Sequence, residues 1–229
     1  MDSNHYFTEG VLRLGGINDL PSRPRSRNPR QHLGVLRRVG VEVNAATEFF
    51  LMASGKIELQ YFQEIESRRM SSFDKCTEDQ FFAEYIYAIM NLGMREQVMR
   101  PIYNKFMLSL NVDDITTRFK NKQRAAAQKG IDNFVRWFGE LKCSKEPVEY
   151  LQTLPLIGKT TKWHLAQNLG IDCVKPDIHL IRLAQRFGFT SPLKMCERIR
   201  DDIGGGEDLK TIDLILWRYC NLYGAGAPL

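Results

Sequence analysis

The chain has 229 residues and a net charge of +5, and 43% of its residues are apolar. That length suits one large domain or two small ones, and that apolar fraction supports a packed core, which excludes an intrinsically disordered chain. No stretch approaches the roughly 20 apolar residues needed to cross a bilayer, and the N-terminus lacks the pattern of a secretory signal. We therefore expect a cytoplasmic protein without a membrane partner.

The positive charge is concentrated at the N-terminus. Residues 1–40 hold seven arginines against three acidic residues, a local net charge of +4, so the rest of the chain carries only +1. Residues 20–32 contain three prolines and four arginines, a composition typical of an extended segment. We assign residues 1–42 to a basic N-terminal arm. Such an arm could bind a polyanion such as DNA, and it could equally be a tail that only keeps the protein soluble.

From about residue 43 the apolar pattern is helical, and no convincing strand pattern occurs. Thr77 and Gln80 predict a capping box at the start of one helix, Gly93 predicts its end, and Pro101 predicts a kink in the next. The predicted helices cover 44–53, 57–69, 78–92, 95–110, 121–142, 147–153, 159–169, 176–187, 192–202 and 207–223. The sequence therefore predicts an all-α fold, with residues 43–229 forming the helical domain.

The five cysteines are widely spaced and include no Cys-x-x-Cys pair. Neither a zinc site nor an iron–sulfur cluster is indicated by this spacing. We expect free thiols in a reducing compartment, with no metal and no cofactor.

One segment has the pattern of an anion-binding hairpin. Residues 154–162 read Leu-Pro-Leu-Ile-Gly-Lys-Thr-Thr-Lys, and Gly158 permits a tight hairpin that a ligand can approach closely. The N–H groups that open the next helix are unpaired and can bind an anion, and Lys159 and Lys162 add positive charge beside them. A DNA phosphate is the natural ligand for such a site, because phosphate contacts fix register without reading sequence.

A carboxylate follows this hairpin, 17 residues after Thr160. Pro176 is favoured at the first position of a helix, which makes Asp177 the second residue of the helix and places its charge at the favourable end of the dipole. An ionised carboxylate stabilises the positive charge that develops on a sugar losing its base, and it can direct the attacking water. Acidic residues also occur in first turns for stability alone, so catalysis is inferred from the combination with the hairpin.

The combined segment resembles the helix-hairpin-helix DNA glycosylases, which include endonuclease III and the adenine, 8-oxoguanine and alkyladenine enzymes. Their hairpin reads Leu-Pro-Gly-hydrophobic-Gly, matched here by residues 154–158, with Leu156 in place of the first glycine. Their essential aspartate stands about twenty residues later in the pattern Asp-x-His-hydrophobic-x-Arg, matched by residues 177–182. The motif match covers roughly residues 150–188.

This resemblance implies a two-lobed helical fold with the active cleft between the lobes, double-stranded DNA as partner, and Asp177 as the essential carboxylate. Members that also cut the strand carry a lysine two residues after the last hairpin glycine, and this position is Thr160 here. Because a Schiff base needs an amine, the resemblance implies a monofunctional glycosylase that uses water. We expect it to act as a monomer.

The remaining site residues are expectations from the same resemblance, and each also has a plain structural interpretation as core or solvated surface. The base pocket is expected at His164, Thr160, Trp217, Tyr219 and Tyr223. A wedge that fills the gap left by the flipped base is expected at Met94 or Arg95. Contacts to the DNA backbone are expected at Leu156, Ile157, Gly158, Lys159, Thr161, Lys162 and Arg182.

Three alternatives stay open. The chain could be a non-catalytic DNA-binding module in which Asp177 only begins a helix, a bifunctional glycosylase with a displaced lyase lysine, or a helical regulator whose basic arm binds an acidic partner. The sequence also leaves the target base open between a damaged base in repair and a bulky modified base in phage DNA, which would make the enzyme a defence protein.

Overall fold

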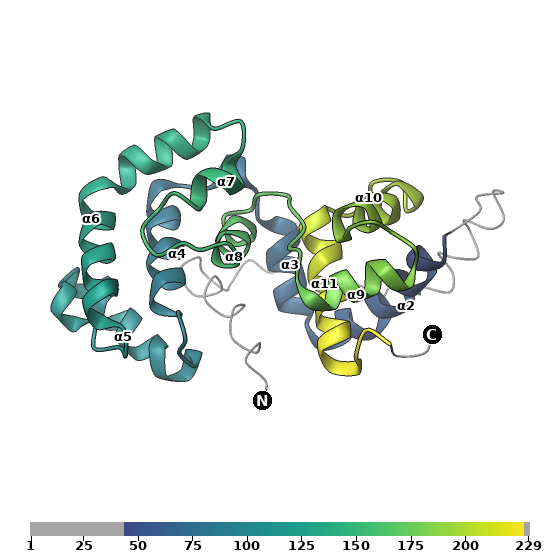
Figure 1. The fold of residues 1–229 in the computed structure, drawn as a ribbon, viewed down its shortest axis with the longest axis horizontal. Coiled ribbons are helices and arrows are strands. Elements are labelled where there is room, and N and C mark those ends of the chain that lie inside the picture. The colour runs from purple at the N-terminus through teal and green to yellow at the C-terminus, as the bar shows by residue number, and fades with distance from the viewer. Residues whose placement is uncertain (1–43, 227–229) are drawn as a thin grey trace. The chain divides into compact units, whose positions relative to one another are not determined.

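The computed structural model describes residues 44–226, so the arm predicted at 1–42 lies outside the described residues. Within 44–226 all regular structure is helical, which confirms the predicted all-α class (Figure 1). None of the helices in this range combines the length and apolarity needed to span a membrane. The described chain falls into two compact units, the first comprising Ser71–Ile171 and the second comprising residues 44–70 and 172–226.

The first unit consists of five α-helices and two short 3₁₀ turns. In chain order they are η3 (Phe73–Lys75), α4 (Glu78–Met90), α5 (Glu96–Ser109), η4 (Val112–Asp114), α6 (Lys120–Cys143), α7 (Pro147–Leu151) and α8 (Thr161–Asn168). The predicted capping box is confirmed, because the Thr77 side chain accepts the Gln80 N–H and the Gln80 side chain accepts the Thr77 N–H. The helix ends agree with the predicted ends to within two residues.

Helix α4 is the centre of this unit and packs against α6 and α8. Most of its residues are buried, including Phe81, Tyr85 and Ile89. The Tyr85 hydroxyl lies 3.1 Å from the Pro155 carbonyl oxygen and donates a hydrogen bond to it, and burial raises the pKa of Tyr85 well above its usual range, which keeps it a donor. The core of the unit therefore holds the chain at residue 155, where the predicted hairpin begins.

The second unit joins the first two described helices to the last three. They are α2 (Ala45–Gln60), α3 (Phe62–Met70), α9 (Ile178–Arg186), α10 (Pro192–Asp202) and α11 (Leu209–Tyr223). Helix α11 contacts all four others, and residues 209–220 are all buried. The predicted break between 53 and 57 is wrong, because Gly55 continues inside α2 and the chain breaks at Tyr61 instead. Packing against α11 outweighs the low helix propensity of one glycine.

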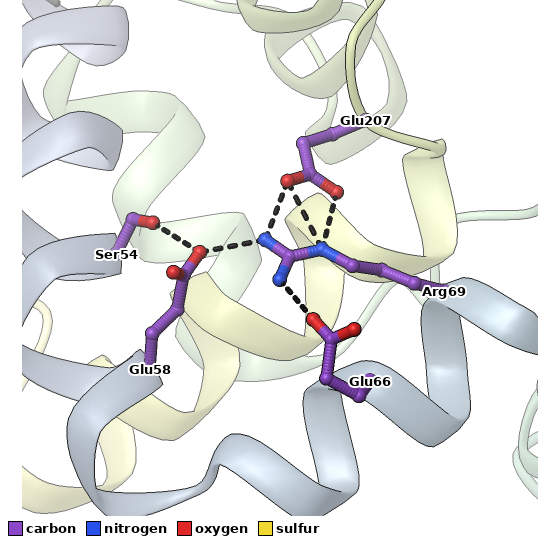
Figure 2. A network of polar contacts seen from close by, with 5 residues as sticks. All are labelled: Ser54, Glu58, Glu66, Arg69 and Glu207. Carbon is purple, nitrogen blue, oxygen red and sulfur yellow. Dashed lines mark hydrogen bonds and ion pairs between the residues drawn. The ribbon is translucent and has the colours of Figure 1, made fainter. Parts of the chain in front are cut away.

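A charged network joins three segments of this second unit (Figure 2). The Arg69 guanidinium, at the end of α3, pairs with Glu58 and Glu66 at 2.6 Å each and with Glu207 just before α11. Within α2, Ser54 donates a hydrogen bond to Glu58. Arginine suits this position because its planar fork binds several carboxylates at once.

Candidate functional site

The candidate catalytic carboxylate stands at the end of a three-residue turn, Lys175-Pro176-Asp177. The N–H of Asp177 donates to the carbonyl oxygen of Lys175 at 2.9 Å, which closes a γ-turn centred on Pro176. The fixed φ of proline is close to the value that an inverse γ-turn needs. The turn delivers the chain into α9 with Asp177 in an extended conformation, φ −92° and ψ 166°.

Asp177 is the N-cap of α9 and lies before the first helical residue. The prediction that Pro176 occupies the first helical position and Asp177 the second is therefore wrong. Its carboxylate oxygen Oδ1 accepts the N–H of His179 at 2.9 Å and the N–H of Leu180 at 3.1 Å. A capping side chain needs an extended backbone, and this requirement outweighs the preference of proline for the first turn. The charge-assisted bonds fix Oδ1 at the positive end of the helix dipole.

The second carboxylate oxygen of Asp177 faces a lysine that the sequence interpretation missed. The Lys175 Nζ atom lies 3.2 Å from Asp177 Oδ2, and the two side chains are only 11% and 12% exposed. The Lys175 N–H donates to Asp213 Oδ2 on α11 at 2.5 Å, and its ammonium lies 5.6 Å from the centre of the Trp217 ring. One feature of the sequence could have drawn attention to Lys175. It is a single lysine between the apolar pair Cys173-Val174 and the motif residues Pro176-Asp177.

The charge of Asp177 also affects a thiol on helix α11. Burial raises the pKa of Cys220 to about 12, and the nearby Asp177 carboxylate raises it further while Arg186 opposes the shift. Cys220 is therefore a neutral, buried thiol beside the carboxylate, and it carries no nucleophilic role at neutral pH.

In the hairpin of the first unit, Leu156 adopts a backbone conformation that usually requires glycine. Leu156, at the position of the family's first hairpin glycine, has φ +62° and lies in the left-handed region. Gly158 lies outside that region, so the expectation that it makes the tight turn possible is wrong. A Cβ at Gly158 would meet no atom of residues 44–226 within 4 Å. No contact in this range therefore requires glycine at 158, whereas close approach by an external ligand would.

The start of α8 offers unpaired amide groups, as the sequence indicates. Thr160 is the N-cap but gives no side-chain cap, and in the described chain the amides of residues 158–161 donate no backbone hydrogen bond. Gly158, Lys159 and Thr160 are exposed. Unpaired N–H groups at a helix start are groups that bind anions in proteins, and anion binding at this one stays a prediction.

Lys162 does not extend this anion site. Its side chain is 8% exposed, and its Nζ atom pairs with both carboxylate oxygens of Glu149 on α7, at 2.6 and 2.7 Å. The expectation that Lys162 contacts DNA is therefore not supported by its position, because its charge is already neutralised. Lys159 remains the exposed cation of the hairpin.

Comparison with known proteins identifies the fold. No protein-family model and no curated protein matches the sequence. The structure is similar to the crystal structure of the 8-oxoguanine DNA glycosylase of Thermotoga maritima, with a TM-score of 0.53 and 15% identity, over 86% of this chain and 98% of that chain. The chain therefore shares the helical fold of that glycosylase. At this identity the likeness is one of fold.

The aromatic residues predicted for the base pocket of this glycosylase fold differ in exposure. Tyr219 is 1% exposed and packs edge-on against Phe49, with ring centres 5.0 Å apart, so it belongs to the core of the second unit. Tyr223 is 51% exposed, and Lys56 lies over its ring at 5.5 Å. Trp217 is 9% exposed, and its buried indole N–H has no hydrogen-bond partner within residues 44–226. Of the three aromatic residues, Tyr223 is therefore the most exposed.

The other residues expected in the glycosylase site lie on helix starts and turns. His164 is half-buried on α8, one turn after Thr160, Thr161 is half-buried, and Ile157 is buried. Arg182 is exposed on α9. The predicted wedge lies at the junction of α4 and α5, where Met94 is half-buried and Arg95 is the exposed N-cap of α5. Their contacts with DNA stay predictions.

The structure groups these residues by unit. The hairpin residues, Thr160, His164 and the predicted wedge belong to the first unit, whereas Asp177, Arg182 and the aromatics of α11 belong to the second. All five cysteines are free thiols. Among residues 44–226 no cluster of histidine, cysteine, aspartate or glutamate has the arrangement of a metal site.

Proposed function

We propose that this chain is a DNA glycosylase that hydrolyses the bond between a flipped base and its sugar and leaves an abasic site. The observation that carries the proposal is the Asp177 carboxylate, fixed at the start of α9 by two backbone N–H groups in a glycosylase fold. Double-stranded DNA is the proposed partner and the monomer the proposed form.

The proposed reaction uses the charge of Asp177 and the hairpin backbone in separate roles. Amides of residues 158–161 and the exposed Lys159 bind a DNA phosphate and hold the register of the duplex. The base leaves its stack because the bond to be cut is inaccessible in a duplex. As that bond breaks, positive charge develops on the sugar, and the Asp177 carboxylate stabilises it and directs water to the sugar carbon.

In each unit taken by itself, one helix carries the residues that we propose for contact with the flipped base. Thr160 and His164 would contribute from α8. On α11 the half-exposed ring of Tyr223 is suited to stacking on the base, and Trp217 is also proposed to contribute. The buried position of Tyr219 makes it a support for Tyr223, since their ring centres lie 4.9 Å apart.

Water is the proposed nucleophile, because Thr160 has no amine for a Schiff base. Lys162 is not suited to the role of a displaced lyase lysine, since it is buried and paired with Glu149, whereas Lys159 is exposed and is the hairpin lysine that borohydride trapping would test. The products would be a free base and an unbroken abasic strand, without a cofactor.

The test is incubation with duplexes that each carry one modified base: 8-oxoguanine, alkyladenine, uracil, and a bulky modified pyrimidine of the kind found in phage DNA. The 8-oxoguanine duplex comes first because the structural neighbour is a glycosylase for that base. Alkali then cuts the strand at each abasic site. We expect the wild-type chain to release at least one of these bases, and release of none would count against the proposal.

The Asp177→Asn variant separates the enzyme from a non-catalytic DNA-binding module. Asparagine caps helices about as well as aspartate, so the variant keeps the start of α9 and loses only the charge. We expect base release to fall by about 100- to 1,000-fold, the loss typical of removing a group that stabilises transition-state charge. Unchanged base release would show that Asp177 only begins a helix.

A further inference from the structure

Lys175 places a positive charge where the local sequence is apolar. It follows Cys173 and Val174, both buried, and its own side chain is 11% exposed. Burying a lysine ammonium is costly unless a partner compensates for the lost hydration. An apolar residue of similar length would fill the same space, so stability alone does not explain a lysine at this position.

The geometry around Lys175 directs its charge at one atom. The γ-turn across Pro176 brings the side chains of Lys175 and Asp177 together, with Nζ 3.2 Å from Oδ2. The backbone of Lys175 is held by its N–H bond to Asp213 on α11. Its ammonium is bounded by the Trp217 ring. The lysine is thus fixed at its backbone and at its tip.

The two oxygens of Asp177 are fixed by different partners. The N–H groups of His179 and Leu180 hold Oδ1, but they leave the carboxylate plane free to turn about that oxygen. The ion pair at Oδ2 removes this remaining freedom. Each carboxylate oxygen can accept more than one hydrogen bond, so a fully held carboxylate can still face a sugar or a water molecule.

We propose that Lys175 is a positioning residue for base release, holding the Asp177 carboxylate in a single orientation toward the reacting sugar. The proposal rests on the proposed glycosylase function. As an ammonium ion, Lys175 has no lone pair with which to attack the sugar, so its role is electrostatic and geometric. Asp213 and Cys220 on α11 and Arg186 on α9 are further charged or titratable groups near the pair.

The test compares Lys175→Met and Lys175→Arg with the wild-type chain on the modified-base duplex that the wild type cleaves in the panel above. Single-turnover rate, affinity for a duplex with a tetrahydrofuran abasic-site analogue, and Tm are measured for each. Because misplacement by about 1 Å can cost 100-fold in rate, we expect Lys175→Met to lower the rate by about 10- to 100-fold. We expect its DNA affinity to stay within about twofold, and Lys175→Arg to recover most of the rate because it restores the charge.

The matched control is Lys210→Met. Lys210 is a buried lysine of the same unit whose ammonium pairs with Asp208 and not with Asp177. We expect this variant to release base at the wild-type rate per folded molecule. If Lys175→Met and Lys210→Met lower the rate equally, Lys175 has only a general structural role and the proposal is overturned.

A second measurement does not depend on catalysis. Lys175→Met, Asp177→Asn and the double variant form a thermodynamic cycle read as Tm. A coupled pair predicts that the double variant loses less than the sum of the single losses, with a discrepancy of about 2–4 °C for a chain of this size. If the Tm shifts of the two single variants add up to that of the double variant, the two side chains do not interact. That result overturns the proposal even if Lys175→Met has lost its activity.

The outcomes separate this proposal from the proposed function. If Asp177→Asn releases base as fast as the wild type, the glycosylase assignment of Asp177 is wrong. If Asp177→Asn is inactive and Lys175→Met is as active as the wild type, only the positioning role is wrong. Trapping of a covalent DNA adduct at Lys175 by borohydride would make it a nucleophile and would overturn the positioning role.

Discussion

The two buried lysines of the motif segment, Lys162 after the hairpin and Lys175 before Asp177, have opposite kinds of partner. Lys162 pairs with Glu149, whose side chain is 57% exposed, whereas Lys175 pairs with Asp177, whose side chain is 12% exposed. The first pair anchors α7 to α8 and leaves the hairpin amides as the anion contact. The second pair is internal and orients the carboxylate to which we assign the chemistry. A lysine near a DNA-binding motif is therefore not by itself a phosphate ligand.

The anchoring role of the first pair predicts an asymmetry between its two partners. Glu149→Gln leaves the buried Lys162 ammonium without a counter-charge, so we expect it to lower the free energy of unfolding by about 1–2 kcal/mol. Lys162→Met keeps the buried stem and leaves only a solvated glutamate, so we expect a loss below about 1 kcal/mol. Urea denaturation of both variants measures the difference. Equal losses, or a larger loss for Lys162→Met, would contradict this description of the pair.

The hairpin backbone predicts a binding defect without a stability defect. In Gly158→Ala the new methyl group meets no atom of the described chain within 4 Å, so we expect the free energy of unfolding to change by less than about 0.5 kcal/mol. The methyl group would obstruct a phosphate at the amides, and we expect affinity for duplex DNA to fall about tenfold, equivalent to about 1.4 kcal/mol. Fluorescence anisotropy at fixed salt measures it. Unchanged affinity would place the DNA backbone elsewhere.

The left-handed backbone of Leu156 predicts that glycine at this position is more stable than alanine. Leu156→Gly and Leu156→Ala both remove the side chain, but only glycine adopts φ +62° without strain. We therefore expect the glycine variant to be more stable than the alanine variant by about 1 kcal/mol. Chemical denaturation of the two variants decides this, and an alanine variant of equal stability would mean that position 156 carries no strain.

The five cysteines predict different labelling of the two units at pH 8. In the first unit Cys143 is exposed, and burial raises the pKa of Cys76 to about 11 against the charge of Lys142. In the second unit burial raises the pKa of Cys173 and Cys220 to about 12 each, and Cys196 is fully buried. A thiol with a raised pKa stays protonated and unreactive until the pH approaches that value. We expect rapid labelling at Cys143 alone.

The same shifts set the direction of the pH dependence of stability. A pKa that is higher in the folded than in the unfolded state contributes stability that is present below the unfolded value and is lost as the pH rises through the folded value. For Cys76, Cys173 and Cys220 that window lies between about 9 and 12. Rapid labelling of a second-unit thiol in the native protein at pH 8 would contradict the burial described for it.

The helix layout could be predicted from the sequence because it depends on local patterns. Apolar periodicity and the Thr77–Gln80 capping box locate most helices to within two residues. Such patterns do not show whether a single glycine breaks a helix. Gly55 stays helical because packing of α2 against α11, more than 150 residues later in the chain, decides the matter.

The site was predictable in its motif residues and less so in their surroundings. The motif located Asp177 and the hairpin, but the capping position of Asp177 depends on a turn that helical periodicity does not describe. The burial of Lys162 depends on Glu149, thirteen residues earlier on another helix. The role of Lys175 depends on Asp213 and Trp217, which only the folded second unit brings to it.

The most direct test of the central claim is the intact mass of a modified-base strand after incubation with the wild-type chain and, in parallel, with Asp177→Asn. We predict that the wild type yields an unbroken strand that has lost the modified base and gained a hydroxyl group, and that the variant leaves the strand unchanged while still binding the duplex. The same abasic product from both proteins at the same rate would contradict the account.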